Sequence, residues 1–147
     1  MNKSVKIHFH LEIDEDGYPP ASVESVWAET AEAPDEYVLD NIPFFARSAT
    51  IGDTVKAVES DDALWFKGLV RGSGNSLIRV VFFDVGWFDR INRAVVDMGC
   101  STEYSEPHKL LAVSIPQGVD LKQVQVLLQD ATDAGHIDYE EPILRQP

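Results

Sequence analysis

The chain has 147 residues, of which 25 are acidic and 12 basic, so its formal net charge is −13. This length supports one ordinary domain or two small ones and excludes a large multidomain enzyme. The charge argues against direct binding to nucleic acid or to an anionic membrane surface, because both require a positively charged patch. Cys100 is the only cysteine, so no internal disulfide forms. Because neither a membrane-length apolar run nor an apolar leader is present, we expect a cytoplasmic protein.

Short strands separated by turn-forming residues fill the first half of the chain. Apolar residues alternate from Val5 to Ile13, which predicts a strand with one buried face, and the acidic, proline-containing stretch from Asp14 to Pro20 ends it. Further strands are predicted at residues 23–30, 37–39, 54–59 and 63–71. About five short antiparallel strands indicate a small SH3-like barrel.

The pattern changes after the loop at residues 72–76, which predicts a boundary between a β-rich subdomain at 1–76 and a second subdomain at 77–147. Helical spacing is found at residues 87–99 and between Asp120, a predicted N-cap, and Gly135. Strands are predicted at residues 77–83, 100–104, 109–115 and 137–144. This order of strand, helix, strand, strand, helix and strand indicates a ferredoxin-like half, and the whole chain an α+β protein.

Three groups of residues could carry chemistry, and none completes a recognised motif. His8 and His10 share a strand face, as two metal ligands can, but no further ligand completes the set. The loop at 72–76 lacks the lysine and the following helix of a phosphate-binding loop. Cys100 and His108 would act as nucleophile and base only if folding joins them. We therefore predict a non-enzymatic protein with no metal site and no cofactor.

Two acidic segments are the candidate partner-binding surfaces. The first is a turn formed by Asp14, Glu15, Asp16 and Tyr18. The second lies near the end of the chain and contains Asp130, Asp133, Asp138, Glu140 and Glu141. The spacing of the first segment does not match a calcium loop. Concentrated acid accelerates association with a basic partner, and an exposed aromatic side chain can anchor the interface.

Most aromatic side chains, in a set that includes Phe83 and Trp87, lie on periodic faces and are expected in the core. The adjacent pairs Phe44-Phe45 and Trp65-Phe66 differ, because successive strand residues point to opposite faces. On a strand, one ring of each pair would face outward; the alternative is that the second domain covers both faces.

Several segments together resemble the bacterial domain-of-unknown-function 4265 family. The segments are residues 5–12, the D-G-Y-P-P run at 16–20, residues 24–28, the N-I-P-F-F run at 41–45, the Gly52-Asp53 turn and residues 71–76. The likeness covers most of the chain. It implies no established activity, catalytic residue or cofactor.

These features favour an immunity protein or other inhibitor, whose acidic side chains mask the basic active site of a toxin or an enzyme. An alternative is an enzyme or sensor that binds a small ligand or a metal between the two halves, using His8, His10 and residues 72–76. A third possibility is a structural subunit of a larger assembly.

Overall fold

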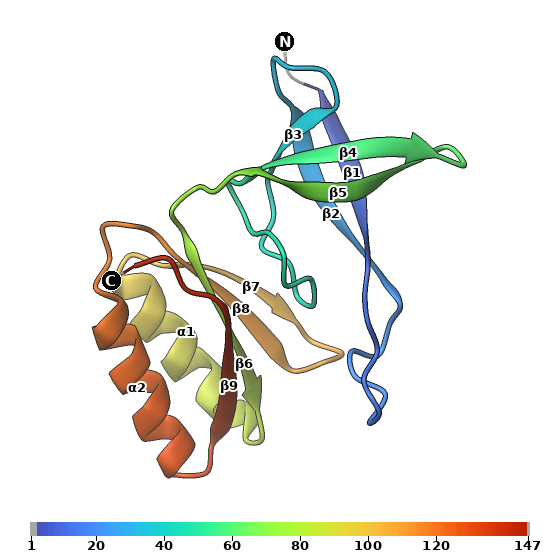
Figure 1. Cartoon of the computed structure of the whole chain (residues 1–147). Helices are drawn as coiled ribbons and strands as arrows, with labels where there is room; N and C mark the ends of the chain where they lie inside the picture. The colour runs from blue at the N-terminus through green and yellow to red at the C-terminus, as the bar shows by residue number, and fades with distance from the viewer. Residues whose placement is uncertain (1–2, 147) are drawn as a thin grey trace. The chain divides into compact units, whose positions relative to one another are not determined.

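A computed structural model describes residues 3–146, and the chain divides into two compact units between Ser73 and Gly74 (Figure 1). Two mainly antiparallel sheets and two α-helices make it an α+β protein dominated by strands, which confirms the predicted class. Within the described part of the chain, no helix is long and apolar enough to cross a membrane. Met1 and Asn2, at the position where an apolar leader would begin, lie outside the described residues.

The first unit is a closed barrel with the strand order β1-β2-β3-β4-β5. Its strands are β1 Ser4–His10, β2 Val23–Thr30, β3 Glu36–Leu39, β4 Thr54–Ser60 and β5 Ala63–Arg71. Sequential neighbours are antiparallel, so β5 runs in the same direction as β1, and these two strands close the barrel as a parallel pair. The interior is apolar and consists mainly of Ile7, Phe9, Val26, Ala28, Leu39, Val55 and Ala57.

The first strand is shorter than the alternation predicts. The alternation predicts a buried Ile13, but β1 ends at His10 and the Ile13 side chain is 50% exposed. The reason lies in the turn that follows, where the Asp14 carboxylate accepts hydrogen bonds from the backbone N–H groups of Asp16 and Tyr18. This turn takes the chain away from the barrel wall before Ile13 can be covered.

The second unit is a four-stranded sheet with the order β7-β8-β6-β9. Its elements are β6 Ser76–Phe82, the 3-10 turn η1 Val85–Trp87, α1 Phe88–Asp97, β7 Ser101–Ser105, β8 Leu110–Ile115, α2 Leu121–Asp133 and β9 Ile137–Ile143. The two α-helices lie side by side on one face of this sheet (Figure 1), and their buried residues Ile91, Val95, Val124 and Leu128 pack with those of β6 and β8.

The helix ends follow from local chemistry. Asp120 caps α2 as predicted, although its carboxylate accepts from the backbone N–H of Lys122, 3.0 Å away, rather than from that of Gln123. Gly99 and Gly135 follow the two helices with φ values of +106° and +84°, which glycine adopts without steric cost. The helix predicted from residue 87 is preceded by η1, whose cap is Asp84.

Candidate functional site

Four of the predicted acidic residues belong to α2 and β9 of the second unit, and three of them act on Tyr139. Asp130 and Asp133 are exposed on the C-terminal half of α2, whereas Asp138 and Glu141 belong to β9. We name this group, together with Tyr139, the α2–β9 acidic surface. Burial and the negative charges of Glu141, Asp133 and Asp138 raise the pKa of the Tyr139 hydroxyl. Three carboxylates from two elements therefore lie near enough to one hydroxyl for their charges to act on it.

Hydrogen bonds between α2 and β9 hold this surface in place. The Tyr139 hydroxyl donates to Gln129 Oε1 at 2.9 Å, and Gln129 Nε2 donates to Asp133 Oδ1 at 2.8 Å. Gln125 Nε2 donates to Glu141 Oε2 at 2.6 Å. These amides therefore fix the orientation of the Asp133 and Glu141 side chains.

Glu140 differs from its neighbours, because its carboxylate is used inside the unit. Its Oε1 lies 3.4 Å from Nη1 of Arg79, a side chain that is only 1% exposed. Alternation along β9 turns both Asp138 and Glu140 away from the face of Tyr139 and Glu141, but the exposed Asp138 still acts on the Tyr139 hydroxyl through its charge, whereas Glu140 is paired with Arg79. A buried guanidinium needs a compensating charge, so Glu140 stabilises the sheet and is the least suited of the acidic candidates to contact a partner.

The loop between β6 and α1 lies beside the start of β9. The backbone N–H groups of Phe83 and Asp84 donate to the His136 carbonyl oxygen at 3.1 and 3.3 Å. The Phe83 side chain is 69% exposed and that of Val85 is 53% exposed. β6 ends at Phe82, whose ring is in the core, so the next residue faces solvent. Phe83 is therefore an exception to the core position expected for most aromatic side chains.

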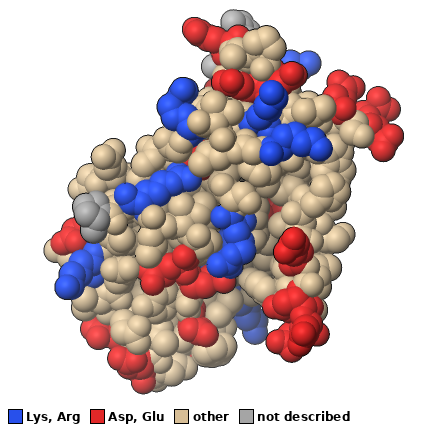
Figure 2. Space-filling model, viewed as in Figure 1, with Lys and Arg blue, Asp and Glu red and all other residues tan. Residues whose placement is uncertain are grey.

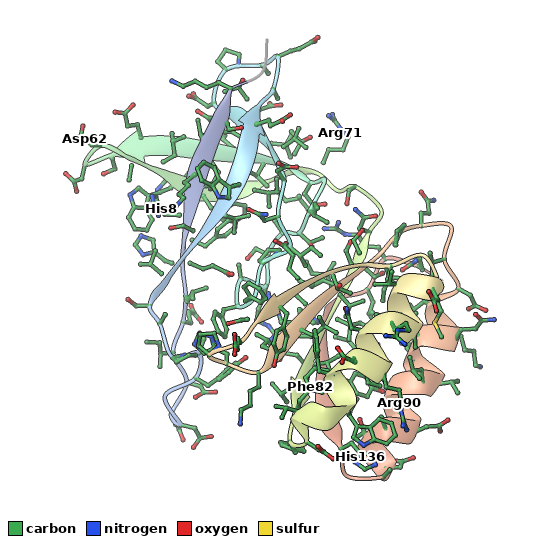
Figure 3. The ribbon with its side chains drawn as sticks, turned by 180° about the vertical axis from the view of Figure 1, so that it is seen from behind. His8, Asp62, Arg71, Phe82, Arg90 and His136 are labelled. Carbon is green, nitrogen blue, oxygen red and sulfur yellow. The ribbon has the colours of Figure 1, made fainter. Side chains whose placement is uncertain are left out.

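Trp87 is held by a histidine and an arginine. The His136 ring stacks on it with centroids 3.9 Å apart, and the Arg90 guanidinium carbon lies 4.2 Å from the ring centroid. His136 Nδ1 is also 3.9 Å from Asp84 Oδ2. Figure 3 shows Arg90 and His136 at the same end of the second unit. This stacking fixes the loop that carries Phe83 and Val85.

The turn that begins at Asp14 is the first of the two predicted acidic segments, and it is exposed on the first unit. Its Asp14 carboxylate caps the turn from within, as described above, whereas Glu15 and Asp16 face solvent. Tyr18 is 42% exposed, and its ring makes an edge contact with Phe45 at a centroid distance of 5.9 Å. Figure 2 shows acidic side chains at the tips of the β1–β2 and β4–β5 hairpins.

The two histidines of β1 lie on the outer face of the barrel against Trp65. The His10 ring stacks on Trp65 at 4.1 Å, and His8 Nδ1 is hydrogen-bonded to the Ser25 hydroxyl at 2.6 Å. Phe66, the neighbour of Trp65, points inward and stacks on Phe9, so the two rings of this pair lie on opposite faces of β5. Among residues 3–146, no group of three or more His, Cys, Asp or Glu side chains is placed to hold a metal ion.

The other two candidate constellations are engaged in structural contacts. In the loop at 72–76, the Ser73 N–H donates to the buried Asp53 carboxylate at 2.9 Å, and the Ser76 hydroxyl is bonded to Gln146. Burial raises the pKa of the Cys100 thiol to about 11, so the thiol is protonated and unreactive at neutral pH. The imidazole of His108 is hydrogen-bonded to the Ser105 hydroxyl at 2.8 Å.

Sequence reasoning missed Glu24, whose carboxylate organises the N-I-P-F-F loop. Its two oxygens accept from the backbone N–H groups of Phe44, Phe45 and Ala46 at 2.6, 3.0 and 2.8 Å. The available signal was its register, because Glu24 lies opposite the inward-facing Phe9. A carboxylate on the inner face of a strand requires donors, and an irregular loop supplies them.

Comparison with known proteins places the chain in a recognised family and fold. The family model described as "Domain of unknown function (DUF4265)" matches residues 24–139. A solved structure of a hypothetical protein from Neisseria gonorrhoeae is similar, with 20% sequence identity and a TM-score of 0.78, over 97% of this chain and 96% of that one. At this identity the likeness shows a shared fold alone. No curated protein matches the sequence.

Proposed function

The chain belongs to the DUF4265 family, and on that premise we propose that it is a non-enzymatic acidic protein that binds and masks the basic site of a toxin or an enzyme. The observation that carries this proposal is the acidic group around Tyr139, in which hydrogen bonds hold Asp133 and Glu141 and the charge of Asp138 adds to theirs. Negative charges that are held close together repel one another, and a cationic group placed between them lowers their electrostatic energy. A basic partner supplies that group.

The mechanism is electrostatic attraction followed by occlusion. The net charge of −13 attracts a basic protein over a distance of several ångströms, and the α2–β9 acidic surface then contacts lysine or arginine side chains in the partner's cleft. The ring of Tyr139 supplies apolar contact area next to these ion pairs. A cleft filled in this way no longer admits its own anionic substrate, which is how an immunity protein or inhibitor acts.

The acidic turn with Glu15, Asp16 and Tyr18 is proposed as a second contact of the same kind. It combines exposed carboxylates with a ring that is 42% exposed, the combination expected at the rim of an interface with a basic protein. Because its backbone is held by the Asp14 carboxylate, the turn presents these groups without first having to order.

The test begins with affinity capture of the tagged protein from native lysate, followed by identification of a basic protein that high salt releases. That protein is then purified, and its affinity for this chain is measured by calorimetry together with its activity. The triple variant Asp133→Asn, Asp138→Asn, Glu141→Gln is expected to bind about ten-fold or more weakly, with a smaller salt dependence. It should also relieve inhibition.

A matched control neutralises three acids at the β4–β5 hairpin, with Glu59→Gln, Asp61→Asn and Asp62→Asn. It removes the same charge from elsewhere on the chain and should weaken binding by less than about three-fold. Equal effects of the two triple variants would show that only net charge matters and would remove the site assignment. Capture without any basic, salt-released partner would contradict the function itself.

We further propose a cytoplasmic location and finer names for the two units. The buried, unpaired thiol of Cys100 suits a reducing compartment. The closed five-stranded barrel supports an SH3-like description of the first unit, and the order β7-β8-β6-β9 with both helices on one face supports a ferredoxin-like description of the second.

A further inference from the structure

The two helices of the second unit leave an apolar groove between them. It has a volume of about 380 Å³ and is lined by Met98, Lys122, Gln123, Val126 and Leu127. The Val126 side chain, which lines the groove, is 52% exposed. Lys122 is the only cation of α2 and lies at the rim of the groove. The groove therefore suits an apolar group that carries a negative charge beside it.

The same unit carries a projection with those properties. Phe83 and Val85 are 69% and 53% exposed, and Asp84 lies between them. We name these three residues the Phe83 knob. The knob is preformed, because its backbone donates to the His136 carbonyl oxygen and its Asp84 carboxylate accepts from the Gly86 N–H at 3.0 Å. Exposed aromatic side chains on an ordered backbone are the usual anchors of protein interfaces.

The knob and the groove of one chain lie at opposite ends of α2. The knob is bonded to His136, just beyond the C-terminal end of the helix, whereas Lys122 and Gln123 belong to its first turn. The 13 residues of α2 separate the two ends by about 20 Å. A chain cannot fill its own groove with this knob, but a second copy can.

We propose that two copies of the chain form a dimer in which the Phe83 knob of each enters the α1–α2 groove of the other. A two-fold axis that sets the α2 helices antiparallel brings the C-terminal end of each helix beside the N-terminal end of its partner. The same arrangement places Asp84 of one copy near Lys122 of the other. It also brings Asp130 toward the positive end of the partner's helix dipole.

Salt distinguishes this dimer from the complex proposed above. Each copy carries a net charge of −13, so the two copies repel, and added salt should screen that repulsion and tighten an association based on apolar contact. The complex with a basic partner has the opposite dependence, because salt weakens attraction between opposite charges. The dimer proposal rests on the groove and the knob, so it stands or falls separately from the inhibitor function.

The test is sedimentation equilibrium of the full chain from low-micromolar to near-millimolar concentration, at low and high salt. The wild-type chain is expected to form a reversible dimer that tightens with salt. Phe83→Ser removes the knob, Val126→Glu places a charge in the groove, and each should raise the dimer dissociation constant about ten-fold or more. Leu69→Ser and Val70→Glu make similar changes at exposed positions of β5 and should leave it unchanged.

Mixing the two interface variants gives a sharper result. A mixed dimer pairs the intact groove of the Phe83→Ser chain with the intact knob of the Val126→Glu chain, so one of the two contacts survives. The mixture should therefore associate more tightly than either variant alone, while circular dichroism confirms that both are folded. A wild-type monomer under all conditions, or a dimer that neither variant weakens, would overturn the proposal.

Discussion

Glu24 offers the most direct test of how the first unit is held together. Its carboxylate accepts three backbone N–H bonds from the loop at residues 44–46. Replacing it with alanine leaves three donors without their acceptor in a partly buried position. Hydrogen bonds to a charged acceptor contribute about 1.5–3 kcal/mol each, but water can reach part of this loop, so about 1 kcal/mol per bond is the appropriate value. We expect Glu24→Ala to lower the free energy of unfolding by about 3 kcal/mol.

The assay is urea unfolding followed by tryptophan fluorescence in a Trp87→Phe background, so that Trp27 and Trp65 report on the first unit alone. A loss of about 3 kcal/mol moves the urea midpoint of a unit of this size by about 2 M. Glu24→Gln keeps one acceptor oxygen and should lose about half as much. Glu29→Ala, an exposed acid on the same strand, is the control and should change stability by less than about 0.5 kcal/mol. A Glu24→Ala variant as stable as this control would refute the argument that the carboxylate organises the loop.

Three further predictions concern ionisation and turn geometry. Glu141→Gln removes a negative charge that opposes phenolate formation, so it should lower the pKa of Tyr139. This pKa is measured as the difference in absorbance between each variant and the same variant with Tyr139→Phe. Asp130→Asn is the control and should lower the pKa less. The Cys100 thiol should resist thiol reagents at neutral pH until denaturant unfolds the chain. The pKa of this thiol rises from 9.0 to about 11 on folding, so the folded state holds the proton more tightly than the unfolded state. The free energy of unfolding of the wild type should therefore fall as pH rises from 9 toward 11, and that of Cys100→Ala should fall less. Asp61 and Asp62 both have positive φ, 53° and 64°, as tight hairpin turns require. Asp62→Gly should therefore raise the free energy of unfolding by about 0.5 kcal/mol, and Asp62→Val should lower it; urea unfolding measures both changes.

Local patterns predicted most of the secondary structure. The strands expected at residues 23–30 and 63–71 match β2 and β5, because period-two alternation and flanking turn residues mark both ends. The last helix likewise begins after its predicted cap at Asp120. These features depend on residues that are close in the sequence, so the sequence of this chain is enough to predict them.

The site depends on contacts that sequence order does not contain. The grouping of Asp133 with Glu141 requires α2 to pack on β9, and the exposure of Phe83 depends on where pairing with β9 stops. Glu140 shows the reverse case, since alternation along a strand could have separated it from its neighbours. Glu24 required knowledge of which loop covers the end of β2. With the exception of Glu140, long-range packing therefore decided the residues that were missed or misassigned.

The parallel closure of the barrel has a consequence for its dynamics. β1 and β5 share only two paired positions, Ile7 with Leu64 and His8 with Trp65, whereas β1 and β2 share seven. Amide protons along the β1–β5 seam should therefore exchange with solvent before those of the β1–β2 ladder, because fewer hydrogen bonds must break to expose them. Once this seam opens, the barrel becomes an open sheet in which β1 and β5 each have one unpaired edge, and each edge can add a strand from another polypeptide.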